Sequence, residues 1–328
     1  MRRITVLTVA AIGGVVLVGC TPAVPVAGVA APVEVTAATT EEQGARVQEE
    51  TFAELAAADE EYSTAEMGVR VGGDALLMRR AEYKQAKEDE KVTPEVLPSE
   101  MQAVYVSSAE TWPRLMVTVS EQPSEDTTPV VSVWVQDDVD TPYQLRNFAH
   151  MVPGATLPAM PGPSVGADQL AMDTDIGDSS LQAVLENYLT LLDEGEDSDL
   201  NETFAEDSYR NQLFANRAAL TKVAKTADGK YADEIGPVQD GTYAMATADG
   251  GALIFAPVSM TSSVSVEDAK VTIPDADEPL VDGKIVDKAT YEYIDMVIMY
   301  VPPADSEDLP AVVAAQHRPI RVSPDGAK

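Results

Sequence analysis

Side chains that carry chemistry near neutral pH are few in this sequence. Its 328 residues include two histidines, His150 and His317, and one cysteine, Cys20. Neither histidine has another histidine or the cysteine close by in sequence, so a structural role is the simpler interpretation of both. A carboxylate brought in from elsewhere in the chain would instead make either histidine a candidate general base. We predict no catalytic residue, no metal site and no cofactor.

Two further patterns resemble functional motifs but lack essential parts. Gly162-Pro163-Ser164-Val165-Gly166 spells the GxSxG of a nucleophile elbow. That elbow requires a strand before the serine and a helix after it, whereas the surrounding prolines predict a linker. Asp197, Asp199 and Asn201 have the spacing of calcium ligands, but Glu202 replaces the required glycine and Ser208 the bidentate glutamate. We interpret this segment as a solvated acidic loop, with weak calcium binding left open.

One small basic face stands out in an acidic chain. Arg80, Lys84 and Lys87, next to Arg79, share one side of a predicted helix. This face would suit docking of an acidic partner or an anionic polymer. Pairing within the molecule, with Glu82 and the acidic residues 88–90, is the alternative that we favour.

The overall charge excludes whole classes of partner. The chain has 55 acidic and 22 basic residues, a formal net charge of -33, so nucleic acid and anionic lipid surfaces would repel it. Hydrophobic residues make up 45% of the chain, enough to build folded cores.

The first twenty residues predict export. Arg2 and Arg3 precede an apolar run from Ile4 to Val18, which is too short to cross a bilayer. Leu17-Val18-Gly19-Cys20 resembles the lipobox of bacterial lipoproteins. This resemblance implies cleavage between Gly19 and Cys20, acylation of Cys20, and anchoring at the outer face of the cytoplasmic membrane.

Hydrophobic periodicity and breaker residues predict the organisation that follows. We expect a signal peptide at 1–19, a disordered tether at 20–45, a first domain at 46–160, a linker at 161–177, a second domain at 178–323 and a tail at 324–328. In each domain helical patterns precede β-branched, alternating runs, which predicts the α+β class. The best helical pattern runs from Leu181 to Leu192 behind a capping sequence at Ser179–Gln182.

Three segments of the first domain carry a family resemblance. They are Thr111-Trp112-Pro113-Arg114, Thr141-Pro142-Tyr143-Gln144-Leu145-Arg146 and Val152-Pro153-Gly154-Ala155-Thr156-Leu157-Pro158. With the lipobox, they are similar to stretches of an uncharacterised family of actinobacterial lipoproteins. The order of elements resembles two tandem domains of the NTF2-like or cystatin-like fold, each with helices packed on a curved antiparallel sheet. The family brings no known activity.

The expected function is therefore binding. We expect a non-catalytic interaction module of the cell envelope, anchored through Cys20, whose partner is an envelope protein or a small ligand. Tyr291, Tyr293 and Met299 lie in a long strand pattern and are the expected contact residues, because aromatic and methionine side chains offer large contact areas. The alternative is an enzyme with a pocket on an NTF2-like scaffold, using His317 or His150 with a nearby carboxylate.

Replacement of the cysteine tests the anchor. Cys20→Ala should leave the protein unprocessed or released from the membrane fraction, because Cys20 is the one cysteine in the sequence and no other thiol could be acylated. Thr21→Ala, with an intact lipobox, is the matched control. Intact mass and membrane fractionation give the answer, and unchanged mass with full membrane retention of Cys20→Ala would contradict the prediction.

Overall fold

A computed structural model describes residues 37–65, 67, 69–89, 91–238 and 240–324. The first half contains helices α1 (Glu41–Glu61) and α2 (Gly73–Glu88), followed by four strands. These strands are β1 (Met101–Val106), β2 (Arg114–Ser120), β3 (Val130–Gln136) and β4 (Gln144–Met151). The predicted order of helices before strands is confirmed.

The second half repeats this order with longer strands. A small hairpin, β5 (Asp175–Ile176) and β6 (Ser179–Ser180), leads into helix α3 (Leu181–Glu194), the short 3-10 helix η1 (Asp199–Thr203) and helix α4 (Ser208–Thr226). The strands are β7 (Lys230–Pro237), β8 (Tyr243–Ala246), β9 (Ala252–Ser265), β10 (Lys288–Val301) and β11 (Ala311–Ser323), with the 3-10 helix η2 (Asp275–Leu280) between β9 and β10.

Helix α1 begins earlier than the sequence analysis expected. Thr40 caps its N-terminus by accepting a hydrogen bond from the backbone of Gln43, whose side chain in turn accepts one from the backbone of Thr40. This reciprocal capping box satisfies amide groups that have no partner within the helix. Residues 41–45 are therefore helical, and the prediction that the tether extends to residue 45 is wrong for them.

All the long strands belong to one antiparallel sheet. Its order is β1-β2-β3-β4-β11-β10-β9-β7, and β8 also pairs with β9. The two halves join where β4 meets β11, through the pairs Ala314↔Met151 and Ala315↔His150. The α+β class with antiparallel strands is confirmed, but the sheet is continuous where we expected two separate sheets.

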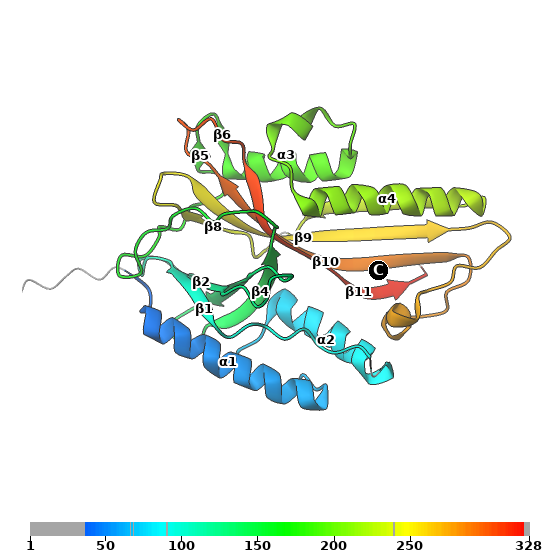
Figure 1. The fold of residues 1–328 in the computed structure, drawn as a ribbon, viewed down its shortest axis with the longest axis horizontal. Coiled ribbons are helices and arrows are strands. Elements are labelled where there is room, and N and C mark those ends of the chain that lie inside the picture. Colours follow the sequence, from blue (N-terminus) through cyan, green and yellow to red (C-terminus); the bar gives the residue numbers. More distant parts are fainter. Residues whose placement is uncertain (1–36, 66, 68, 90, 239, 325–328) are drawn as a thin grey trace, which may run out of the picture. The chain divides into compact units, whose positions relative to one another are not determined.

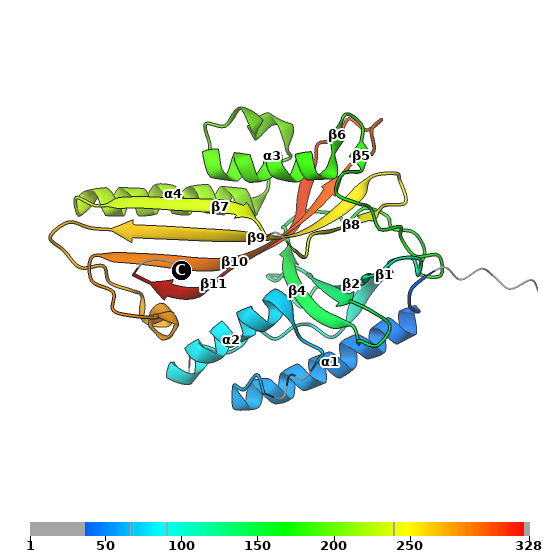
Figure 2. The same ribbon diagram turned by 180° about the vertical axis from the view of Figure 1, so that it is seen from behind.

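Helices cover different faces of the two halves of this sheet. Figures 1 and 2 show α1 and α2 against β1–β4, and α3 and α4 along β7–β11. One core lies beneath α1 and α2 and includes Met78, Met116 and Trp134, while another beneath α3 and α4 includes Tyr188 and Leu192.

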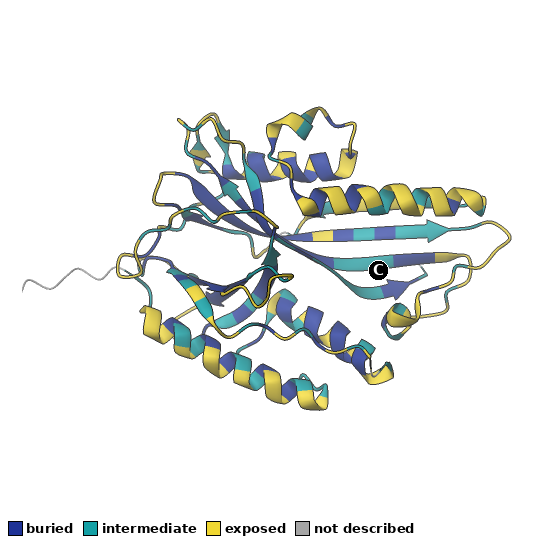
Figure 3. Cartoon of the chain, viewed as in Figure 1, coloured by how far each residue is buried: buried dark blue, intermediate teal, exposed yellow. Residues whose placement is uncertain are grey.

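A third core lies between the two halves of the sheet. It joins Val117 and Val133 of the first half to Phe255, Met296 and Ile298 of the second. Several strands are thus buried on both faces, as the dark stretches in Figure 3 show. This explains why their sequences are continuous apolar runs instead of strictly alternating ones.

The shared core gives a test of whether each half folds on its own. Both tryptophans, Trp112 and Trp134, lie in the first half, so their fluorescence reports on the unfolding of that half. Leu192→Ala, in the core of the second half, should destabilise the protein by about 2–5 kcal/mol and should shift the tryptophan transition in urea, because the halves share a sheet and a core.

Leu220→Ala on the outer side of α4 is the control, since Leu220 is 37% exposed. A tryptophan transition that stays in place while circular dichroism becomes biphasic would instead support the two independent domains predicted from sequence.

Candidate functional site

The lipid attachment site lies outside the described residues. This applies to Cys20, to Gly19 and to the whole predicted signal peptide. Across the part of the chain that is described, no helix has the length and apolar character needed to cross a membrane.

The structure separates the three expected contact residues. Met299 is fully buried in the core beneath α3 and α4, so its proposed contact role is wrong. Strands β9 and β11 flank β10 along its whole length, and Met299 differs in that it belongs to the core cluster formed with residues of α3 and α4. Tyr291 and Tyr293 are half-buried, and their rings stack with centroids 6.0 Å apart.

His317 continues this stack and binds a buried carboxylate. The centroids of the Tyr293 and His317 rings lie 4.3 Å apart, and the rings are almost parallel. His317 Nδ1 lies 2.8 Å from Asp295 Oδ1, and the Tyr209 hydroxyl donates to Asp295 Oδ2 at 2.5 Å. Asp295 is completely buried, so it holds the imidazole in one orientation. Sequence reasoning missed this pair because Asp295 and His317 lie on neighbouring strands, 22 residues apart.

His150 is part of a larger ionic cluster between the two halves. Its Nε2 lies 2.6 Å from Glu95 Oε1, and Arg318 of β11 donates to Glu95 Oε2, also at 2.6 Å. Arg79 donates to Glu82 at 2.9 Å and to the carbonyl of Glu95 at 2.9 Å. The expected pairing of Arg79 with Glu82 is thus confirmed.

The environment shifts the pKa values of this cluster in different directions. The hydrogen bond with Glu95 raises the pKa of His150, against the opposing effect of burial. Burial would raise the pKa of Glu95, but the bond and charge of His150 and the charge of Arg318 lower it overall. Burial dominates at Glu82 and raises its pKa, although Arg79 and Arg318 act in the other direction.

The remainder of the basic face points away from this cluster. Arg80, Lys84 and Lys87 are exposed. Lys84 and Lys87 border a shallow cavity of about 560 Å³ together with Glu88, Asp275 and Glu278. Because carboxylates share that cavity, it is not a purely basic docking surface.

The two motif-like segments have structural explanations. Gly166 adopts a left-handed backbone conformation with φ +79°, and a Cβ there would lie 2.8 Å from the carbonyl oxygen of Ser107. Asp199 and Asn201 belong to η1, where Ser198 caps the helix start. Within the described residues, no group of three or more His, Cys, Asp and Glu side chains is arranged to hold a metal ion.

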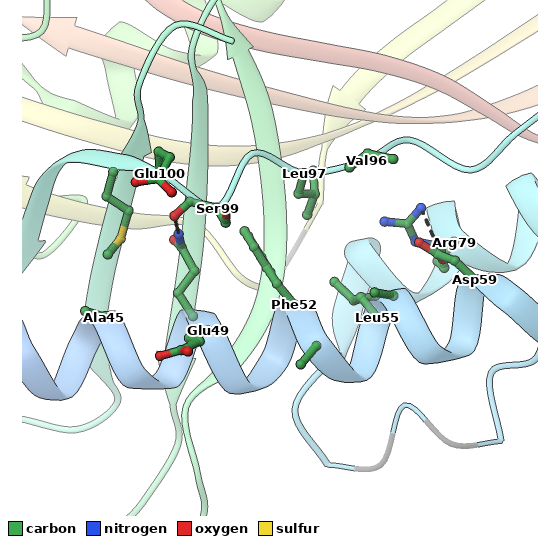
Figure 4. A pocket seen from close by; sticks show the side chains of 14 residues that line it. Ala45, Glu49, Phe52, Leu55, Asp59, Arg79, Val96, Leu97, Ser99 and Glu100 are labelled. Carbon is green, nitrogen blue, oxygen red and sulfur yellow. Dashed lines mark hydrogen bonds and ion pairs between the residues drawn. The ribbon is translucent and has the colours of Figure 1, made fainter.

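A groove of about 700 Å³ runs between α1 and the extended segment 96–101. Figure 4 shows Phe52 and Leu55 on the α1 wall and Val96 and Leu97 on the opposite wall. Val96 is 84% exposed, so this wall presents apolar surface to solvent. Gln48 of α1 donates to the carbonyl of Ser99 at 3.0 Å and so connects the two walls.

Asp59 and Arg79 close one end of this groove (Figure 4). Arg79 lies 3.6 Å from Asp59 and is buried, with 3% of its side chain exposed. Its bond to the Glu95 carbonyl connects the groove to the ionic cluster. Neither histidine lines the groove.

The sequence analysis did not identify the groove residues. Two signals were available: the alanines of α1, which leave room beside Phe52, and Pro94 and Pro98, which favour an extended chain around Val96. Neither signal shows that the two segments lie together, because 44 positions separate residues 52 and 96.

Comparison with known protein families shows which family the chain belongs to. A model described as "Domain of unknown function (DUF8094)" matches residues 35–320. The chain belongs to the DUF8094 family. Its model spans both halves of the sheet, in agreement with the structure. No curated protein and no solved structure matches the chain.

Membership of the DUF8094 family agrees with the expected resemblance to an uncharacterised family. The matched range begins after the predicted signal peptide and includes both walls of the groove, both histidines and the ionic cluster. These features therefore lie within the family domain and not in an added segment.

The His150–Glu95 pair predicts a pH-dependent contribution to stability in this DUF8094 protein. Because the pKa of His150 is raised in the folded state, the contribution is fully present below the unfolded value of about 6.5 and is lost as pH rises through the folded pKa. His150→Gln should therefore cost up to about 1 kcal/mol at pH 6 and less at pH 9, since the histidine is one-third exposed and solvent screens the pair.

Urea unfolding at the two pH values measures this difference between variant and parent. In a Glu95→Gln background only burial and the charge of Arg318 would act strongly on the pKa of His150, and both lower it, so the extra cost of His150→Gln at pH 6 should disappear. A larger cost at pH 6 than at pH 9 that persists in that background would show that another group is responsible.

Proposed function

We propose that this protein is a lipid-anchored, extracytoplasmic lipoprotein of the bacterial cell envelope that binds a partner in the α1 groove and performs no catalytic turnover. The groove carries this proposal: two walls that are distant in sequence enclose about 700 Å³ and leave Val96 84% exposed. Exposed apolar side chains in a formed groove are typical of binding sites.

The anchor belongs to the same proposal. The Leu17-Val18-Gly19-Cys20 sequence supports acylation of Cys20 and attachment at the outer face of the cytoplasmic membrane. The net charge of -33 would repel the protein body from anionic lipid, so the groove would be presented away from the membrane. An actinobacterial origin, and descent of each half from an NTF2-like or cystatin-like domain, are parts of this proposal that rest on resemblance.

An enzyme is the second candidate, and one observation favours it. Buried Asp295 orients His317 through Nδ1, as a carboxylate does in many acid–base sites. We rank this candidate second because Tyr293 stacks on the imidazole and the α1 groove is lined by other residues.

Site-specific crosslinking in intact cells tests the binding proposal. A benzophenone amino acid at Val96 should capture a defined partner, whereas the same group at Val139, a 76% exposed residue in the loop after β3, should not. Ala56→Tyr would fill the groove and should reduce the Val96 adduct about tenfold.

Ala57→Tyr is the matched control for the blocking substitution. Ala57 is exposed on the same helix, about 100° around its axis from Ala56, and it does not line the groove. Equal adducts from Val96 and Val139, or a Val96 adduct that resists Ala56→Tyr, would refute a binding site in the groove.

A further inference from the structure

The charges around the groove indicate what kind of partner fits it. Glu49 lies on the α1 wall and Glu100 on the opposite wall, and both side chains are exposed. Neither forms an ion pair with another described residue within 4.0 Å. A third carboxylate, Asp59, lies at the closed end.

The one basic side chain of the lining does not offset the charges of Glu49 and Glu100. Arg79 is buried and already bonded to Glu82 at 2.9 Å, with Asp59 at 3.6 Å. Glu82 is itself buried, so the guanidinium charge is balanced within the protein. An incoming ligand would therefore meet a negative potential along the groove.

The floor between these carboxylates is apolar and elongated. Leu55 and Leu97 are buried beneath it, and the accessible apolar surface comes from half-buried Phe52 and Met101 and exposed Val96. The α1 wall extends from Ala45 to Asp59, which at 1.5 Å per residue is about 21 Å. This length accommodates about four helical turns, or about six extended residues.

We infer that the occupant of the groove is a cationic amphipathic segment of another protein. Its apolar side chains pack on Phe52, Val96 and Met101, while its lysine or arginine side chains pair with Glu49 and Glu100. This inference rests on the proposed function of the groove and adds the chemical class of the partner. Charge complementarity across such a contact speeds association and selects the partner.

The same charges disfavour the other occupants. A second copy would bring another net charge of -33. Anionic lipid and nucleic acid would meet like charge at both walls. A purely apolar ligand would contact the apolar lining but would leave the carboxylates of Glu49 and Glu100 without a partner.

Binding of designed peptides tests the class of partner. The probes are three fluorescent 14-residue amphipathic peptides with the same leucine face and a polar face of lysine, glutamine or glutamate. The full lipidated chain is held in phosphatidylcholine nanodiscs at 150 mM salt, with empty nanodiscs as the blank. The lysine peptide should bind roughly tenfold more tightly than the glutamine peptide, and the glutamate peptide should not bind measurably.

Charge reversal on the protein provides the second comparison. Glu49→Lys with Glu100→Lys should weaken binding of the lysine peptide at least about tenfold. Glu61→Lys with Glu202→Lys makes the same change in net charge at exposed residues outside the groove, and should change affinity less than about threefold. Circular dichroism confirms that each variant is folded.

Four other outcomes would overturn the inference. If the glutamine peptide binds as tightly as the lysine peptide and Ala56→Tyr removes both, the groove binds its partner without charge selection, and only the inference fails. If no peptide binds but the Val96 crosslink persists, the occupant belongs to another chemical class. If both pairs of charge reversals weaken binding equally, the peptide responds to the acidic surface as a whole. If no peptide binds and the crosslinker at Val96 captures no more partner than the crosslinker at Val139, both the proposed function and the inference are refuted.

Discussion

The junction of β4 with β11 is the constraint on which the rest of this structure depends. Only two residue pairs join these strands, and the ionic cluster of His150, Glu95, Arg318, Glu82 and Arg79 lies beside them. Charges in such partly buried clusters are costly when a partner is removed, because the remaining charge stays desolvated. The cluster therefore fixes how the two halves of the sheet meet.

The groove depends on the same junction. Glu95 is bound through its side chain to both His150 and Arg318 and through its carbonyl to Arg79. Val96 and Leu97 follow directly in the chain, so the wall opposite α1 is fastened at one end to β4, β11 and α2. A substitution of Arg318, in the last strand, would consequently alter the position of the groove wall opposite α1.

Local sequence signals were sufficient for the regular elements but not for their long-range partners. The apolar spacing of Leu181, Val184, Leu185 and Tyr188 predicted α3, and the hydroxyl of Ser180 caps it. The polar alternation of β7 contains few large apolar residues, and that strand was missed. Strand β9 ends at Ser265, opposite Lys288 where β10 begins, so its length is set by its pairing with a strand distant in sequence. Glu95 and Asp295 could not be assigned to the histidines, since only the folded sheet brings these residues together.

Strand β7 forms one edge of the sheet and determines where the sheet ends. Lys230 and Glu234 are exposed along it, and Pro237 at its end has no N–H to donate. A neighbouring molecule that tried to extend the sheet by adding a strand would have to accommodate these charges and would lose one hydrogen bond at the proline. This edge of the sheet is therefore a poor template for aggregation with neighbouring molecules.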